Sequence, residues 1–266
     1  MFDESVQDAW RKRYGVDAPP LPDLSKFLNH RSVRKYRDEP ISDTLLAALV
    51  AAAQSAATSS NLQLWSVISV QEKERREQIA MLCGDQHQIR DAGVFLAFFA
   101  DHHRLRQAAL RQNELAEGLS YAEFFIMAVI DAALAAERMV CAAEALGLGI
   151  CYIGALRNDA EGIKQFFGLP EGTFGVFGLC IGWPEAPLKA EIKPRLRQEA
   201  VWFRERYESE VDTAEYDERM RAFYESQRMK GDVTWSTRSG RRVDLHHMTG
   251  RDTLLGWLRE QGFLLN

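Results

Sequence analysis

The chain has 266 residues, 46% of them hydrophobic, which is enough to form a substantial core in one large domain or two small ones. Its formal net charge of -5 at pH 7 argues against a general nucleic-acid-binding protein, because such proteins usually carry a basic surface. The N-terminus lacks the continuous apolar segment of a signal peptide, and charges or glycines interrupt the longest apolar stretches elsewhere. A cytoplasmic protein with no membrane partner is therefore expected.

Four cysteines are spread along the chain, and three of them lie in strongly apolar runs. Their spacing contains neither a CxxC pair nor the pattern of a metal-ligand set. Free buried thiols in a reducing compartment are therefore favoured over disulfides. The four are Cys83, Cys141, Cys151 and Cys180.

The first half of the chain predicts a short N-terminal helix followed by a proline-rich, extended link at residues 17–24. A helix is expected next, with Ser42 as its N-cap and its end near Gln54, because apolar residues then recur at helical spacing. Residues 64–70 have the β-branched, apolar character of a strand, and a charged helix follows from about Glu72. Residues 94–100 form a second expected strand, apolar on both faces and hence central in its sheet.

Residues 122–146 predict a long helix that is apolar almost all round and ends at Gly147. Such a helix requires cover on every side. A helix buried in a single core and a helix in a subunit interface explain this pattern equally well.

The remaining elements complete an α+β chain with one mixed β-sheet covered by helices. A strand is expected at 149–154, then a helix opened by Asn158 and closed before Gly168, and a last strand at 174–183. From Pro184 the composition becomes polar and charged. Residues 230–242 are expected to form a mobile surface loop, and residues 252–262 an amphipathic final helix.

Two basic segments suit the recognition of an anion. His30, Arg31, Ser32 and Arg34 offer charge-assisted donors and a hydroxyl within five residues. By itself this pattern is more typical of a solvated strand edge. In the second segment, Lys193 and Arg195 lie on the same side of an extended stretch, and Pro194 restricts the backbone between them. The two segments together could converge on one anion.

Two further segments place polar groups at the ends of expected elements. In residues 57–65, hydroxyls and amides crowd between a helix and a strand, which fits either a hydrogen-bonded turn or a ligand-binding loop. In residues 151–159 a strand ends at Gly154, where exposed backbone amides could face a flat ligand. A GxGxxG fingerprint, a Walker loop and an HExxH motif are all missing from the sequence.

Five of these segments occur in one order and spacing: HRSVRKYRDEPIS, TSSNLQLW, GLGICYIGALRND, FGLCIGWP and KPRLR. In this respect the chain resembles the FMN-dependent nitroreductase superfamily, and its nearest branch is the oxygen-insensitive NADPH nitroreductase and flavin reductase group. The resemblance runs from about residue 28 to the C-terminus. It implies an intertwined homodimer with FMN at the subunit interface. Residues 1–24 would then be an N-terminal extension and linker, 25–199 the FMN-binding core, and 200–266 a C-terminal excursion that packs on the partner subunit.

The resemblance also implies which residues hold FMN. Residues matching His30, Arg31, Ser32 and Arg34 bind the cofactor, with Arg34 near the pyrimidine end of the ring, and Lys193 and Arg195 meet the phosphate. Residues matching Thr58, Ser59, Ser60, Asn61 and Gln63 reach the flavin from the other subunit. The ring is bordered by Gln86 and by the backbone near Tyr152, Ile153, Gly154 and Ala155. FMN would carry the chemistry, so no catalytic side-chain acid or base is expected.

The implied activity is hydride transfer from NAD(P)H through FMN to nitroaromatic or quinone acceptors. Preference for NADPH over NADH requires a cation for the extra phosphate. Arg228 and Lys230 are the expected ligands, because related enzymes place an arginine shortly after a tyrosine pair; Arg238, Arg241 and Arg242 are further candidates. Two alternatives stay open: a flavin reductase that supplies a partner monooxygenase, and a flavin-binding protein without turnover.

No metal site is expected. The isolated histidines include the adjacent His102 and His103, whose side chains point apart on a helix or a strand alike. The others are His87, His246 and His247.

Overall fold

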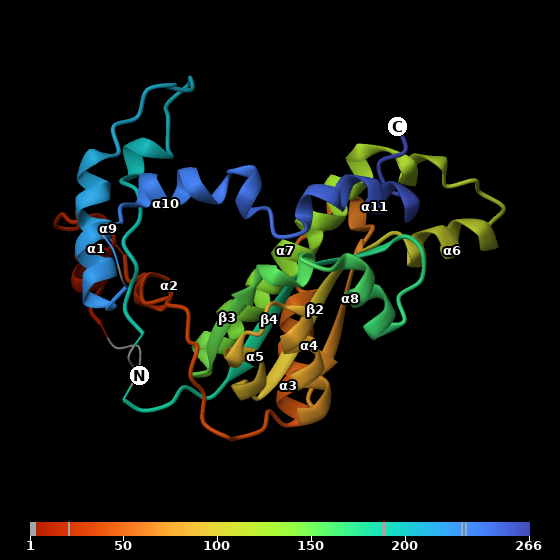
Figure 1. Ribbon diagram of the computed structural model, residues 1–266, viewed down its shortest axis with the longest axis horizontal. Helices are drawn as coiled ribbons and strands as arrows, with labels where there is room; N and C mark the ends of the chain where they lie inside the picture. The colour runs from red at the N-terminus through yellow and green to blue at the C-terminus, as the bar shows by residue number, and fades with distance from the viewer. Residues whose placement is uncertain (1–3, 21, 188–189, 230, 232) are drawn as a thin grey trace. The chain divides into compact units, whose positions relative to one another are not determined.

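The computed structural model describes residues 4–20, 22–187, 190–229, 231 and 233–266 (Figure 1). The chain divides into two compact units. The terminal unit comprises Met1–Arg31 and Lys189–Met248, and the sheet unit comprises Ser32–Leu188 and Thr249–Asn266. Both units therefore combine segments that are far apart in the sequence. The boundary between them falls inside the basic segment, between Arg31 and Ser32.

The sheet unit contains four strands in the order β1-β2-β4-β3. They are β1 (Trp65–Val70), β2 (Val94–Asp101), β3 (Gly149–Ile153) and β4 (Thr173–Gly182). Every residue of β2 is buried, as expected for a central strand that is apolar on both faces. The α+β class is confirmed. The prediction of a mixed sheet is wrong in one respect, because all three strand pairings are antiparallel. A parallel bridge joins Ser32 to Ile150, but Ser32 lies outside the four strands.

Helices cover both faces of the sheet. On one face, α3 (Asp43–Gln54) and α7 (Ala122–Ala145) pack against alternate strand residues, and Leu96, Phe98 and Met139 share this core. On the other face, the Phe99 ring contacts Phe167 of α8 (Ala160–Phe167) edge-on at 5.5 Å. The sheet unit also contains α4 (Lys73–Leu82), α5 (His87–Asp91), α6 (His103–Arg111) and α11 (Leu254–Glu260), with the short turns η1 (Ser59–Asn61), η2 (Glu117–Ser120), η3 (Gly154–Arg157) and η6 (Arg251–Thr253).

The long helix α7 has one buried side and one exposed apolar side. Its buried side carries Ala128, Ala132, Ala135 and other small residues. Ile126, Ile130 and Leu134 are 52%, 50% and 43% exposed and recur every four residues, so they form a single stripe on the helix surface. A contiguous exposed apolar stripe of this kind favours the interface interpretation over a helix fully buried in one core.

The α-helices of the terminal unit are joined by long irregular segments. This unit contains α1 (Val6–Tyr14), α2 (Ser25–Leu28), α9 (Ala214–Ser226) and α10 (Trp235–Arg242), with the turns η4 (Gln198–Ala200) and η5 (Leu245–His247). The N-terminal helix is confirmed as α1, which begins at the N-cap Ser5 and ends at Gly15 in the left-handed region. Residue 21 of the expected link and residues 230 and 232 of the expected loop lie outside the described residues.

Two local predictions are wrong. The expected loop at 230–242 contains the helix α10, whose first turn is capped by the Thr234 hydroxyl accepting a hydrogen bond from the Thr237 amide. The cap of α8 is Asp159 and not Asn158, because the Asp159 carboxylate accepts the Gly162 amide at 2.8 Å. Asn158 instead ends the preceding turn η3. The remaining predicted helices and strands are present with boundaries shifted by a few residues.

The prediction of free, mostly buried cysteines is confirmed. All four cysteines are free, and Cys83, Cys151 and Cys180 are buried. Burial raises the pKa of the Cys83 thiol to about 12, so this group stays protonated and unreactive at neutral pH. In the part of the chain that the structure describes, every helix is too short or too polar to cross a membrane.

A buried histidine lies at the end of the central strand. His102 is fully buried, its ring packs on Phe263 with centroids 4.6 Å apart, and neither imidazole nitrogen has a hydrogen-bond partner within the described chain. Burial lowers the pKa of His102, and the positive charge of the nearby Arg106 adds to this effect. The folded protein therefore favours the neutral ring.

Acid is expected to destabilise the protein partly through His102. An unfolded histidine takes up a proton below about pH 6.5, whereas the buried ring resists protonation, so stability falls as the pH drops through and below this value. Thermal unfolding of the wild type and of His102→Phe, measured at pH 7.5 and 5.5, checks this. The variant keeps the ring packing and should lose less stability between these pH values; equal losses would contradict the prediction.

Candidate functional site

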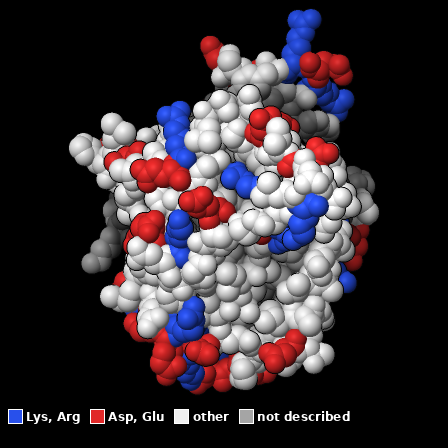
Figure 2. All heavy atoms as spheres, turned by 90° about the vertical axis from the view of Figure 1, so that its right-hand side faces the viewer, with Lys and Arg blue, Asp and Glu red and all other residues white. Residues whose placement is uncertain are grey.

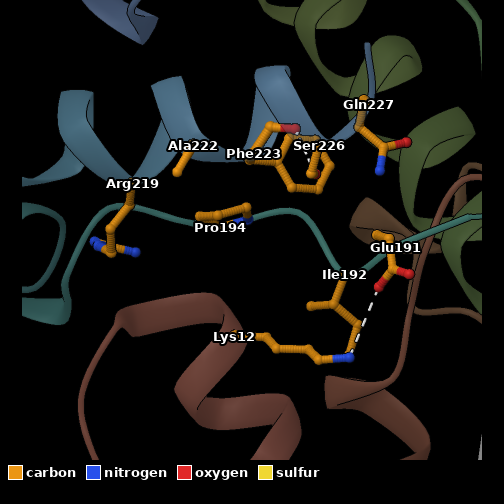
Figure 3. Close-up of a pocket in the computed structure, with 9 residues that line it drawn as sticks. All are labelled: Lys12, Glu191, Ile192, Pro194, Arg219, Ala222, Phe223, Ser226 and Gln227. Carbon is orange, nitrogen blue, oxygen red and sulfur yellow. Dashed lines mark hydrogen bonds and ion pairs between the residues drawn. The ribbon is translucent and has the colours of Figure 1, made fainter.

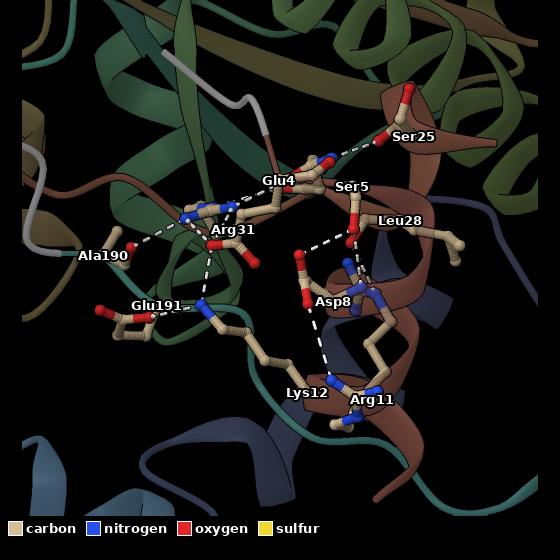
Figure 4. A network of polar contacts seen from close by, with 12 residues as sticks. Glu4, Ser5, Asp8, Arg11, Lys12, Ser25, Leu28, Arg31, Ala190 and Glu191 are labelled. Atoms are coloured by element: carbon tan, nitrogen blue, oxygen red, sulfur yellow. Dashed lines mark hydrogen bonds and ion pairs between the residues drawn. The ribbon is translucent and has the colours of Figure 1, made fainter. Parts of the chain in front are cut away.

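The guanidinium of Arg31 is turned into the terminal unit (Figure 4). Arg31 is 7% exposed and donates to the Asn29 backbone oxygen at 3.1 Å and side-chain oxygen at 3.2 Å. It also lies 3.4 Å from the Glu4 carboxylate and 3.4 Å from the Ala190 carbonyl oxygen. These contacts make Arg31 a structural cation that anchors the basic segment to the N-terminal helix and to the chain near residue 190.

Arg13 brings the two basic segments of the terminal unit together. Its buried guanidinium donates to the carbonyl oxygens of Leu28 and His30 at 2.9 and 2.8 Å. Its own carbonyl oxygen accepts the amide of Arg195 at 2.8 Å. One residue of α1 therefore holds the segment of His30 beside the segment of Arg195.

Lys193 and Arg195 lie on the same side of an extended stretch, as the sequence predicts. Their side chains are exposed, whereas those of Ile192 and Pro194 are buried. Ile192 and Pro194 line a separate cavity of about 490 Å³, together with residues of α9 (Figure 3). Glu191 also lines this cavity, whereas Lys193 and Arg195 are not among its lining residues.

Ser32 and Arg34 lie in the sheet unit beside strand β3. The Ser32 bridge to Ile150 and the 2.8 Å hydrogen bond from the Val33 amide to the Ile150 carbonyl attach this segment to the strand. The attachment is close, because a Cβ on Gly149 would lie 2.7 Å from Val33. The Arg34 side chain is exposed, and the described residues give it no hydrogen bond or ion pair. It is therefore available to a ligand.

The polar loop at residues 58–64 has an unusual backbone. Ser60, Asn61 and Gln63 have φ values of 49°, 55° and 51°, in the left-handed region that residues with a Cβ rarely occupy. The side chains of Ser60 and Asn61 are exposed. The buried carboxylate of Asp131 on α7 accepts hydrogen bonds from Thr58, Ser59 and Leu64 at both ends of the loop.

The end of strand β3 is held by the C-terminal segment. Ile153 is buried, and Gly154 and Ala155 begin the turn η3. Arg251 donates to the Gly154 carbonyl at 3.0 Å and to the Asn158 side-chain oxygen at 2.9 Å. These bonds fix the turn while leaving Gly154 and Ala155 only half-buried.

Tyr152 and Gln86 make contacts inside the sheet unit. The Tyr152 hydroxyl donates to Glu137 at 3.2 Å; burial, and then Glu137, raise the pKa of this tyrosine. The Gln86 amide donates to the Cys83 carbonyl at 3.0 Å and accepts from Gln88 at 2.5 Å. The Gln86 side chain is therefore already engaged within the protein.

The candidate NADPH ligands lie in the terminal unit. Arg228 is exposed, with a φ of 56°, just after α9, and Lys230 lies outside the described residues. Arg238, Arg241 and Arg242 line a cavity of about 550 Å³ with Val233, Ser239 and His247. Arg238 lies over the Tyr224 ring at 4.8 Å, and Arg242 donates to the His247 carbonyl at 2.7 Å. Arg238, Arg241 and Arg242, which the sequence placed in an expected loop, therefore lie around one cavity.

Charge is dispersed on one face of the molecule. Figure 2 shows one face on which acidic and basic side chains are interspersed with uncharged surface, and neither sign of charge dominates. Across the described ranges, no three His, Cys, Asp or Glu side chains are grouped to hold a metal ion.

Sequence reasoning missed Asp131, Arg13 and Arg251. Asp131 is the only charged residue in the apolar run 124–136, and this is a signal that could have singled it out. Arg13 and Arg251 had no such signal, because their carbonyl partners lie 15 or more residues away along the chain.

Comparisons with known proteins agree with this architecture. Residues 28–183 match the nitroreductase family, and residues 193–266 match the C-terminal domain of that family. The chain is 35% identical to an FMN reductase (NADPH) from Bacillus subtilis, over 91% of this chain and 98% of that protein. It is 34% identical to an oxygen-insensitive NADPH nitroreductase from Salmonella typhimurium, over 91% and 98%. The solved structure of the NfrA1 nitroreductase from B. subtilis superposes with a TM-score of 0.84 at 35% identity, over 91% of this chain and 99% of that one. This chain therefore belongs to the nitroreductase family.

Proposed function

We propose that this FMN-dependent NAD(P)H oxidoreductase passes electron pairs from NADPH to nitroaromatic or quinone acceptors, in a site shared by two copies of the chain. The single observation that supports this site best is that Arg13 forms hydrogen bonds with both His30 and Arg195 and so holds their two segments together. Cations gathered in this way suit a phosphate, the part of FMN that carries charge at rest.

His30, Lys193 and Arg195 are the proposed phosphate ligands, and Arg31 supports them. Lys193 and Arg195 expose their side chains, and Arg195 keeps part of its guanidinium on the Lys193 and Pro194 carbonyls at 3.2 Å. Each charge-assisted hydrogen bond contributes about 1.5–3 kcal/mol, so several of them favour tight retention of FMN. The buried Arg31 acts by keeping this segment in place.

The ring is proposed to lie against residues of the sheet unit. Ser32, Arg34 and Gln86 are the proposed contacts, together with the strand end at Tyr152, Ile153, Gly154 and Ala155. From the second copy, the loop with Thr58, Ser59, Ser60, Asn61 and Gln63 completes the site. The support for this arrangement is the exposed guanidinium of Arg34 beside β3 and the exposed polar groups of the loop.

Bound FMN would supply the hydride and two-electron chemistry. Arg34 would contribute a fixed positive charge near the pyrimidine end of the ring and would stabilise the negatively charged reduced state more than the oxidised state. If the site leaves only one face of FMN open, NADPH and the acceptor would bind in turn, which predicts ping-pong kinetics.

A homodimer with a cytoplasmic location completes the proposal. The exposed stripe of Ile126, Ile130 and Leu134 supports a contact between the α7 helices of two copies. The free cysteines support a reducing compartment. We keep residues 25–199 as the FMN-binding core, 1–24 as the extension and linker, and 200–266 as the segment that packs on the partner subunit.

The cavity lined by Arg238, Arg241 and Arg242 is proposed to hold the extra phosphate of NADPH, in preference to Arg228 and Lys230. The double variant Arg238→Ala/Arg241→Ala should raise the KM for NADPH by about 10- to 100-fold, because it removes charge-assisted hydrogen bonds to a phosphate. The KM for NADH should stay unchanged and serves as the internal control. Steady-state kinetics of this variant and of Arg228→Ala decide the question. An increase in Arg228→Ala alone would assign the phosphate to the end of α9.

Visible spectroscopy of the purified protein tests the proposed function. We expect a yellow protein whose flavin absorbance bleaches on anaerobic addition of NADPH and recovers on addition of a quinone or a nitroaromatic compound. Release of free flavin during turnover would favour a flavin reductase that supplies a partner monooxygenase. A flavin that stays oxidised with both NADPH and NADH would mark a binding protein without turnover. A colourless protein that takes up no added FMN would refute the proposal.

A further inference from the structure

Asp131 is a buried carboxylate on the otherwise apolar inner side of α7. It is 1% exposed, and its neighbours on this side, Ala128, Ala132 and Ala135, are fully buried. Within the described chain it forms no ion pair with a lysine or an arginine. Burial of an ionised carboxylate without compensation is strongly unfavourable, so Asp131 requires hydrogen-bond donors from neighbouring residues.

Three donors of a single loop satisfy this carboxylate. The Thr58 hydroxyl donates to Oδ2 at 2.5 Å and the Leu64 amide donates to the same oxygen at 3.1 Å. The Ser59 amide donates to Oδ1 at 3.2 Å. The Thr58 hydroxyl oxygen in turn accepts the Gln63 amide at 3.0 Å. Asp131 therefore ties the first residues of the loop to its last ones.

These bonds enclose the left-handed residues of the loop. Ser60, Asn61 and Gln63 adopt positive φ values that are unfavourable for residues with a Cβ, so the loop needs outside contacts to keep this conformation. Arg104 adds a bond to the Gln63 carbonyl at 3.2 Å. The Ser60 side chain has no hydrogen-bond partner in the described ranges, and it is exposed. Asp131 thus holds the two ends of the loop, and the exposed side chains of Ser60, Asn61 and Gln63 lie between them.

We propose that Asp131 is a positioning residue that sets this loop in the conformation required to bind FMN of the second copy. The inference rests on the proposed function, because it assigns a role to a loop placed at the flavin. Asp131 does not touch FMN in this arrangement. It acts through the Thr58 hydroxyl and two backbone amides, and its loss should weaken FMN binding more than it weakens the fold.

Asp131→Asn tests this directly. The asparagine keeps the shape of the side chain but replaces one acceptor oxygen by an NH2 group, so at least one loop donor then faces another donor. The matched control is Met139→Ala, two turns further along α7, which removes buried packing without touching the loop. Titration of each apoprotein with FMN gives the dissociation constant, and thermal unfolding of the same apoproteins gives their stability.

We expect Asp131→Asn to raise the dissociation constant of FMN at least tenfold and to keep kcat within about threefold of the wild type when FMN is in excess. Met139→Ala should lower the unfolding temperature and change the dissociation constant less than twofold. Hydrogen exchange should speed up at the Ser59 and Leu64 amides in Asp131→Asn and stay unchanged in the strands. An unchanged FMN affinity in Asp131→Asn would overturn the inference, as would an equal weakening in Met139→Ala.

Thr58→Val decides the question if Asp131→Asn does not fold. This variant removes one of the three donors and keeps the β-branched shape, and we expect at least a threefold weaker binding of FMN. Because Thr58 is also a proposed flavin contact, hydrogen exchange of the apoprotein is measured as well; it should speed up at the Ser59 and Leu64 amides, which loss of a flavin contact alone would not cause. Unchanged binding or unchanged exchange would overturn the inference. The wild type separates the two hypotheses. If the wild-type chain takes up no FMN, the proposed function fails; if it binds FMN and both variants bind it equally well, only the role of Asp131 fails.

Discussion

Arg34→Met is expected to slow reduction of bound FMN by NADPH by about 10²–10³-fold, because removal of a fixed charge that faces developing negative charge has effects of this size. The Arg34 side chain is exposed, has no hydrogen bond or ion pair in the described part of the chain, and lies in a segment attached to β3. Its loss should therefore leave the fold intact. Anaerobic stopped-flow measurement of flavin bleaching gives the rate. Arg34→Lys should fall between the wild type and Arg34→Met, since lysine keeps the charge and loses the planar fork.

Lys35→Met is the matched control for Arg34→Met. Lys35 is the next residue and is also exposed, and its replacement removes the same charge from the same segment. We expect a rate within twofold of the wild type. If both variants slowed reduction equally, the general charge of the segment would be responsible, and the specific role of Arg34 would be wrong.

Ile130→Glu is expected to convert the proposed homodimer into monomers. Ile130 is 50% exposed in the middle of the α7 stripe, and in a two-fold interface the change would place a carboxylate in both copies. The cost of burying two unpaired charges is several kcal/mol, which raises the dissociation constant of the dimer on the order of 10³-fold or more. Because the proposed site takes groups from both copies, FMN and activity should be lost together. Analytical ultracentrifugation and the flavin absorbance of the same fractions measure both.

Met81→Glu provides the comparison for this variant. Met81 is 62% exposed on α4, outside the α7 stripe, so the same kind of substitution should leave the assembly and the FMN content unchanged. A dimer that persists in Ile130→Glu with full FMN content would place the subunit contact elsewhere on the chain.

The sequence alone determined most of the helices and strands and the family of the chain. Apolar periodicity and caps predicted the helix opened by Ser42, the long helix that ends near Gly147, and the buried central strand at 94–100, because these signals are local in the chain. The five ordered motifs identified the family. The alternation at residues 192–195 placed Lys193 and Arg195 on one side, because successive side chains of an extended segment point in opposite directions whatever surrounds it.

The tertiary structure decided which distant residues hold these segments in place. Arg13, Asp131 and Arg251 fix the basic segments, the polar loop and the strand end through hydrogen bonds to residues remote in the chain, and no local pattern encodes such contacts. It also turned the guanidinium of Arg31 inward to Glu4 and Asn29, although Arg31 and Arg34 look alike in the sequence. Local preference specifies which groups a segment offers. Packing between segments specifies which of them remain free for a ligand.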